Sequence, residues 1–170
     1  MPHPAVKTIR DLIYWEYAKL ISGSAIGDRK NYRFVMYEFQ KLKKGNIHPS
    51  AILRENKKFY EAEHECAYCG SKEGILEYDH IIPRHKIVID TMDNMVLACR
   101  HCNAAKGDRD PFEWYGLEKR YEIPRIVLGK YLKLIYEIHG RQGTLEKTSL
   151  KSGGELNVYN LGVILPSKAG

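Results

Sequence analysis

Four cysteines in two Cys-x-x-Cys pairs are the feature that most constrains how this chain can fold. The pairs are Cys66/Cys69 and Cys99/Cys102, and the sequence contains no other cysteine. Two residues between cysteines let both thiolates bind one ion through a tight turn, and two such pairs complete a tetrahedral zinc site. Gly70, directly after the first pair, offers the backbone freedom that this turn needs. We therefore expect one structural Zn²⁺ per chain, bound by all four cysteines.

The compartment expected for this chain favours zinc binding by the same four cysteines over the formation of two disulfides. The chain begins Met-Pro-His-Pro, without the basic and then apolar order of a signal peptide. Its longest unbroken apolar run, Met95 to Cys99, has five residues, whereas a membrane-crossing helix needs about 20. We therefore expect a cytoplasmic protein without a membrane segment, and disulfides rarely persist in that compartment. A redox site would need only one of the two pairs.

Length and charge limit the size of the fold and the class of partner. A chain of 170 residues, 44% hydrophobic and 28% charged, has the composition of a globular protein. It is long enough for one core together with a metal-bound subdomain. The net charge of +6 favours binding to polyanions such as nucleic acid. Many globular proteins are equally basic, so charge is only a supporting argument.

Apolar periodicity divides the chain into two helical regions around a central segment of different composition. The predicted helices are bounded by glycines or caps: 6–21 before Gly23 and Gly27, 31–44 before Gly45, Ser50 to about Glu63, and 125–139 before Gly140. Strand candidates at 75–82 and 95–98 are joined by a long loop, and helical patterning resumes after Asp110-Pro111. We expect a helical region at 1–64, a metal-bearing segment at 65–110 and a helical region with a tail at 111–170, in one compact domain.

The segment between the cysteine pairs, 70–98, has 29 residues, whereas simple zinc modules have about 15–20 there. It contains an Asp-His pair at 79–80 and an Asn-x₄-Cys-x₂-Cys run from 94, followed by an Asn-x₂-Lys tail at 103–106. In this order and frame, residues 66–107 resemble the HNH family of ββα-metal nucleases. The resemblance implies an α+β fold: a zinc-stapled ββα-metal motif, two hairpin-like strands and a following helix, flanked by N- and C-terminal helices.

The chemistry of these residue types agrees with that resemblance. Asp79 offers a hard anionic oxygen suited to Mg²⁺ or Mn²⁺, and His80 titrates near neutrality, so its neutral form can take a proton from water. Neighbouring strand residues point to opposite faces, so both reach one site only if the strand ends there. The resemblance implies that Asp79 and Asn103 bind a catalytic Mg²⁺ or Mn²⁺, that His80 is the general base, and that Asn94 holds the loop that orients His80. Many members have His where Asn103 stands, which makes this chain an H-N-N variant.

Other interpretations of single residues stay open. Asn94 can instead cap a turn before the second strand, and His85 is the other plausible base. His101 is a solvent or phosphate contact rather than a ligand. The basic residues near the motif are either phosphate contacts, which we favour, or a solvated face: Arg84, Arg100, Lys106 and Arg109. The remaining histidines are assigned to the surface or the core: His3, His48, His64 and His139.

The function implied by the resemblance is metal-dependent endonuclease activity, expected on double-stranded DNA, with 5′-phosphate and 3′-hydroxyl products. A non-catalytic zinc-ribbon DNA-binding or adaptor module is the main alternative, because it explains the cysteines and the charge but not Asp79, His80 and Asn103. A structural zinc protein in a larger assembly is a third. One active site makes one cut, so double-strand cleavage requires a homodimer or sequential action.

Overall fold

The computed structural model describes residues 3–46, 64–149, 156–158 and 161. The elements in chain order are α1 (Ile9–Ile26), α2 (Tyr32–Lys43), β1 (Leu76–His80), the 3₁₀ turn η1 (Met92–Asn94), β2 (Met95–Cys99), α4 (Arg100–Lys106), α5 (Pro111–Lys119), the 3₁₀ turn η2 (Arg120–Glu122) and α6 (Arg125–Gln142). The fold is α+β. The helix expected from Ser50 to about Glu63 lies outside the described residues.

Helix α1 is longer than its predicted range. Thr8 and Asp11 form a capping box at its start, and Gly27 ends it with a φ of 73°. The expectation that Gly23 breaks the helix was wrong, because Gly23 lies within it. A Cβ at this position would stand 2.6 Å from Cγ of Arg29. Gly23 therefore serves the close packing of a side chain rather than the end of a helix.

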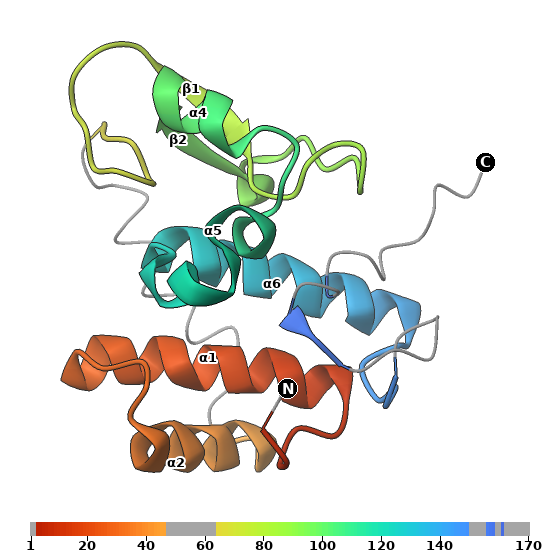
Figure 1. Cartoon of the computed structure of the whole chain (residues 1–170). Helices are drawn as coiled ribbons and strands as arrows, with labels where there is room; N and C mark the ends of the chain where they lie inside the picture. The colour runs from red at the N-terminus through yellow and green to blue at the C-terminus, as the bar shows by residue number, and fades with distance from the viewer. Residues whose placement is uncertain (1–2, 47–63, 150–155, 159–160, 162–170) are drawn as a thin grey trace.

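Helices α2 and α6 pack on either side of α1 (Figure 1). The predicted i, i+4, i+7 stripe of α2 is buried at Val35, Phe39 and Leu42. Helix α6 passes Gly140 and ends before Gly143, whose φ is 68°, so the expectation that Gly140 ends it was wrong. We call α1, α2 and α6 the helical layer.

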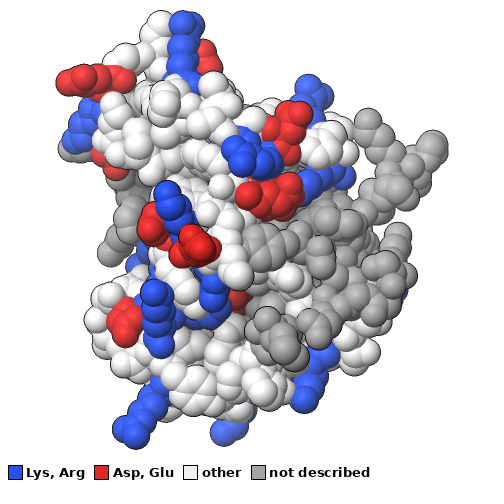
Figure 2. Space-filling model, in the orientation of Figure 1, with Lys and Arg blue, Asp and Glu red and all other residues white. Residues whose placement is uncertain are grey.

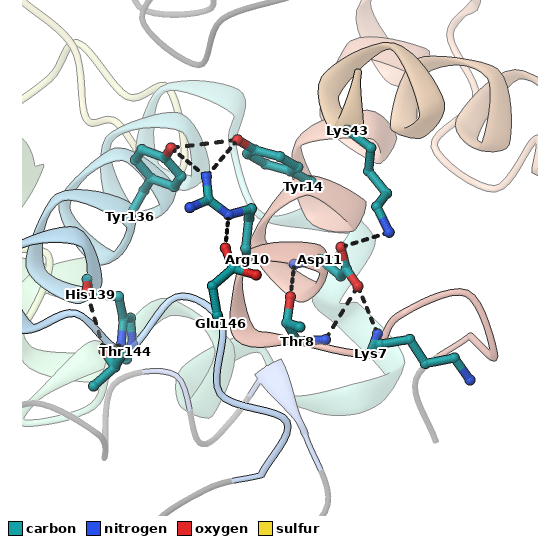
Figure 3. A network of polar contacts seen from close by, with 10 residues as sticks. All are labelled: Lys7, Thr8, Arg10, Asp11, Tyr14, Lys43, Tyr136, His139, Thr144 and Glu146. Atoms are coloured by element: carbon teal, nitrogen blue, oxygen red, sulfur yellow. Dashed lines mark hydrogen bonds and ion pairs between the residues drawn. The ribbon is translucent and has the colours of Figure 1, made fainter. Parts of the chain in front are cut away.

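Polar contacts join the helices of this layer at the N-terminal end of α1 (Figure 3). The Arg10 guanidinium donates to the Tyr136 hydroxyl of α6 over 3.1 Å and pairs with Glu146 over 2.5 Å. Asp11 pairs with Lys43 at the end of α2 over 3.2 Å. Because Asp11 is 3% exposed, this carboxylate needs such partners to be tolerated inside the fold.

Strands β1 and β2 form an antiparallel pair in which Leu76 faces Cys99 and His80 faces Met95, so the two predicted strands are confirmed. Helix α4 follows β2 directly, and we call β1, β2 and α4 the ββα unit. Ile81 and Val96 belong to the same apolar cluster as the helices. The Lys130 ammonium of α6 also donates to the Met95 carbonyl over 2.6 Å. These contacts fix the ββα unit above α5 and α6 (Figure 1).

Among the described residues, no helix combines the length and apolar character required to cross a bilayer.

Candidate functional site

The four cysteine sulfur atoms lie within 4.8 Å of one another. Cys69 Sγ and Cys99 Sγ are 3.8 Å apart. A tetrahedral zinc site with bonds of about 2.3 Å has sulfur–sulfur edges of about 3.8 Å. The four sulfur atoms are thus clustered closely enough to bind one Zn²⁺, as the spacing of the pairs predicts.

Local backbone geometry explains how each pair reaches this point. The Gly70 amide donates to the Cys66 carbonyl over 2.8 Å, and Gly70 has a φ of 74°, which only glycine adopts readily. In the second pair, Cys99 caps α4, and its sulfur accepts from the Cys102 amide over 3.4 Å. The Ala67 amide donates to the Leu97 carbonyl over 2.8 Å. This hydrogen bond attaches the first cysteine pair to β2, the strand that ends at Cys99 of the second pair.

Asp79 lies between the two cysteine pairs in the sequence and is buried, with 6% of its surface exposed. Its Oδ2 accepts from the Tyr68 hydroxyl over 2.5 Å, and the Lys106 ammonium lies 3.2 Å away. Tyr68 stands between Cys66 and Cys69, and Lys106 ends the helix that carries Cys102. Both halves of the zinc site therefore hold the same carboxylate.

Burial changes the proton affinities of both partners of Asp79. Burial lowers the pKa of Lys106, and the nearby Asp79 carboxylate opposes part of that shift. Burial and the Asp79 charge both raise the pKa of Tyr68 far above its usual value. Tyr68 therefore keeps its proton at neutral pH and donates it to Asp79 in a hydrogen bond.

His80 ends β1 and is oriented by an acidic residue of the following loop. Its Nε2 lies 2.8 Å from Asp90 Oδ1, and Arg84 pairs with the other oxygen of Asp90 over 3.1 Å. An ionised carboxylate only accepts hydrogen bonds, so Nε2 carries the proton in this contact. The neutral ring then has its lone pair on Nδ1, which is the nitrogen that can accept a proton.

Asn103 lies on α4 and is oriented by Glu77 of β1. Its Nδ2 donates to Glu77 Oε2 over 3.3 Å, while Arg100 pairs with Glu77 Oε1 over 3.1 Å. Because a carboxylate faces the amide, the nitrogen must be on that side and Oδ1 on the other. The amide oxygen is therefore the atom that Asn103 offers to a cation.

One pocket of about 390 Å³ brings the three predicted residues together. It is lined by Tyr78, Asp79, His80, Pro83, Arg84, His85, Asn103, Gly107 and Asp108. Asp79 and His80 are strand neighbours, and both line it because β1 ends at His80. The pocket thus combines a carboxylate, an imidazole and an amide, which suits binding of a hard cation and proton transfer.

Asn94 lies outside this pocket and is fully buried. Its Oδ1 accepts from the Ile82 amide over 2.8 Å, and its Nδ2 donates to the carbonyls of Ile82 and Ile89, each over 3.0 Å. These bonds hold the loop that follows His80 and carries Asp90. Asn94 is therefore a positioning residue in this structure.

The four basic residues expected to contact phosphates differ in their surroundings. The expectation for Lys106 was wrong, because only 1% of it is exposed and its ammonium binds Asp79 and the His80 carbonyl. Arg109 donates to the carbonyls of Ala105 and Lys106 at the end of α4. Arg84 and Arg100 are exposed beside their acidic partners. On the upper part of the face shown in Figure 2, Lys and Arg side chains lie next to Asp and Glu side chains, whereas several at its lower edge have no acidic neighbour in this view.

The other histidines have separate places. His85 lines the pocket, and His64 and His101 are exposed. His3 stacks on Trp15 with ring centroids 4.6 Å apart, and His139 is buried against Thr144. His48 lies outside the described residues.

Three positioning residues have no signal in the sequence. Tyr68, Glu77 and Asp90 contact Asp79, Asn103 and His80 respectively. Tyr68 is one of the two residues between the cysteines of the first pair, a place that the Cys-x-x-Cys pattern does not specify, and the other two are ordinary acidic residues. Only the zinc pairs and the strand register that bring them together reveal their roles.

Comparison with known proteins agrees with the pattern of the cysteines and the pocket. Residues 66–109 match the model of the HNH endonuclease family. No curated protein and no solved structure matches the chain. The matched residues contain all four cysteines together with Asp79, His80, Asn94 and Asn103. We call residues 66–109, which are similar to the HNH endonuclease family, the HNH segment.

Proposed function

We propose that the chain is a metal-dependent endonuclease that hydrolyses phosphodiester bonds of double-stranded DNA, by nicking or by double-strand cleavage. The observation that carries the proposal is the shared pocket of Asp79, His80 and Asn103. These residues come from the end of one strand and from the following helix. The four-cysteine cluster does not by itself account for this convergence, because none of the three residues belongs to the cluster.

His80 is the general base in this proposal. Asp90 accepts from Nε2 and thereby leaves Nδ1 able to take a proton from the attacking water. Asp90 also restricts the ring, and Arg84 holds Asp90 in turn. Because the His80 ring is already held in one orientation, less side-chain conformational entropy is lost on reaching the transition state.

Asp79 and Asn103 are the proposed ligands of Mg²⁺ or Mn²⁺. When bound, such an ion polarises the phosphoryl oxygens and stabilises the leaving oxygen. Tyr68 and Lys106 already donate to Asp79, which reduces the negative charge that this carboxylate presents to an ion. Mg²⁺ keeps several waters and needs only one or two carboxylates, so this donor set suits a weakly held ion. We expect brief EDTA treatment to remove it and to leave the zinc in place.

The test compares two histidines of the same pocket on supercoiled plasmid with Mg²⁺. Wild-type protein should produce nicked or linear DNA with 5′-phosphate and 3′-hydroxyl ends. His80→Ala should lower the cleavage rate by roughly 10²–10⁴-fold without changing zinc content or DNA affinity. His85→Ala is the matched control and should stay within a few-fold of wild type. If His85→Ala abolishes cleavage and His80→Ala does not, the base is assigned to the wrong residue.

A non-catalytic zinc-ribbon DNA-binding or adaptor module is the second candidate. The observation in its favour is that Asp79 is buried and paired with Lys106, as a purely structural carboxylate would be. Wild-type protein that binds plasmid but cuts nothing with Mg²⁺ or Mn²⁺ would establish this alternative. If the protein does cut, linear DNA that appears without a nicked intermediate indicates a homodimer with two active sites.

A further inference from the structure

A pocket of about 610 Å³ lies in the helical layer, outside the HNH segment. It is lined by Leu20, Gly23, Ser24, Gly27, Asp28, Arg29, Lys30, Tyr121 and Arg125. The C-terminal end of α1, the turn into α2, η2 and the first residue of α6 meet here. In Figure 1 these ends lie together at the left of the molecule. None of the residues proposed for DNA cleavage takes part in this pocket.

The lining of the pocket is basic. Arg29, Lys30 and Arg125 contribute three cations, and Asp28 contributes the only carboxylate among the lining residues. That carboxylate is engaged by its own turn, because Asp28 Oδ1 accepts from the Lys30 amide over 2.8 Å. The side chains that face the pocket therefore attract an anion.

Arg29 is held rigidly in this lining. Its Nη1 donates to the carbonyls of Tyr121 and Ile123 over 3.0 Å and 2.8 Å. Its Cγ occupies the space where a Cβ on Gly23 would stand, 2.6 Å away. Among the described residues, Nε and Nη2 of Arg29 have no hydrogen-bond partner. A fixed guanidinium with free N–H groups is preorganised for the oxygens of a phosphate.

Neighbouring groups concentrate further positive charge at the same place. The Lys30 ammonium lies 4.9 Å from the centroid of the Tyr121 ring, and the Arg120 guanidinium lies 4.5 Å from it on the neighbouring turn. Burial and, less strongly, the charge of Arg125 lower the pKa of Arg29, while Glu16 opposes them. Glu16 is itself paired with Lys19 over 2.9 Å. An anion in the pocket would relieve the repulsion between the two guanidinium groups.

The N-terminal end of helix α6 also makes the electrostatic potential at the pocket more positive. Its first residue, Arg125, lines the pocket, and its N-cap is Pro124, whose side chain makes no capping hydrogen bond. The N-terminal end of an 18-residue helix carries partial positive charge. The helix end, the cavity and the fixed arginine all favour the same chemical class of ligand.

We propose that this pocket binds a phosphate group of the nucleic-acid backbone, so that the helical layer extends the DNA contact beyond the HNH segment. The proposal rests on the proposed function for the identity of its ligand. Guanidinium groups match phosphate oxygens in pairs, and backbone contacts of this kind position a nuclease on its substrate without reading sequence.

The experiment pairs two doubly substituted proteins of equal charge. Lys30→Gln/Arg125→Gln removes two cations from the pocket. Lys7→Gln/Lys44→Gln removes two exposed lysines that flank the opposite end of α1, about 27 Å along the helix. Binding to a short DNA duplex is measured at several salt concentrations in Ca²⁺, and circular dichroism checks that both proteins are folded. The pocket variant should bind about 10-fold more weakly, and its log–log salt slope should fall by about 0.9 relative to the control.

Two further measurements separate the possible outcomes. Inorganic phosphate added to wild-type protein should shift the side-chain NMR signals of Arg29 and Arg125. If phosphate shifts them but both variants bind DNA alike, the site takes a free phosphorylated molecule and the DNA proposal is overturned. If phosphate has no effect and both variants bind DNA alike, the pocket binds neither ligand and the proposal is also overturned. If wild-type protein binds DNA through the pocket but never cuts it, this inference stands and the proposed function fails.

Discussion

The helical layer and the ββα unit of this molecule are held together by different means. The layer buries large apolar side chains completely, among them Ile13, Phe39 and Leu132. The cluster beside the cysteines contains only Cys66, Ala98 and Cys102 as buried members. A unit of this size cannot bury enough apolar surface to offset its loss of chain entropy. The comparison teaches that, beside the candidate site, four clustered cysteines and buried polar contacts stand where the helical layer has large apolar side chains.

Loss of zinc should have the largest effect and should separate the two regions. Cys66→Ser should release the ion, because structural zinc contributes about 10–16 kcal/mol in small zinc-binding units. Hydrogen exchange should then be fast over β1, β2 and α4 while α1 and α6 stay protected. Ala104→Ser, an exposed change in α4, is the control and should keep one zinc per chain. Wild-type protein purified without chelator that contains no zinc would contradict this prediction.

The buried pair of Lys106 and Asp79 tests the polar part of the unit. Lys106→Met should cost about 3–5 kcal/mol in the free energy of unfolding, because it leaves a buried carboxylate without its counter-charge. Chemical denaturation in the presence of zinc measures this cost. Asp79→Asn/Lys106→Met removes both charges and should recover much of it. Equal stability of the single and double variants would mean that the pair carries no electrostatic energy.

A substitution in the apolar core tests whether the helical layer can be destabilised without loss of zinc from the ββα unit. Leu132→Ala removes a fully buried side chain of α6 and should lower the free energy of unfolding by about 2–5 kcal/mol. Zinc should remain bound at one ion per folded chain, because no cysteine is touched. Leu117→Ala, at a leucine that is 61% exposed, is the matched control and should change stability little. Zinc loss from folded Leu132→Ala protein would show that the two regions are not separable.

The smallest effect is expected at the link between zinc and pocket. Tyr68→Phe removes the hydroxyl that donates to Asp79 and should cost about 1–3 kcal/mol of unfolding free energy, with zinc retained. Tyr37→Phe is the control, because Tyr37 lies on α2 outside the pocket and is 58% exposed. Under the proposed function, Tyr68→Phe should also change the Mg²⁺ concentration that gives half-maximal cleavage, whereas Tyr37→Phe should not. An unchanged stability and Mg²⁺ requirement would remove Tyr68 from the positioning role.

The sequence alone was sufficient for the features that depend on short-range geometry. The spacing of Cys66, Cys69, Cys99 and Cys102 predicted the sulfur cluster, because two intervening residues place two thiolates on one ion. Apolar periodicity located α1, α2 and α6, since a helix that packs on a core needs one apolar face. The strand candidates and the Asp-His and Asn-x₂-Lys patterns identified residues that line the pocket. Each motif or helix is recognised from residues within it, and the two cysteine pairs, although separated by 29 residues, are linked by the ion that four thiolates can share.

The tertiary structure alone decided which partners hold the pocket residues. Tyr68 and Lys106 reach Asp79 across 11 and 27 positions, and Asp90 reaches His80 across 10. The burial of Lys106, which sequence reasoning had assigned to phosphate, follows from the same packing. Gly23 likewise stays within α1 because Arg29 packs against it. Side-chain contacts of this kind depend on how strands, helix and metal site are placed relative to one another, and no local pattern of residue types encodes that placement.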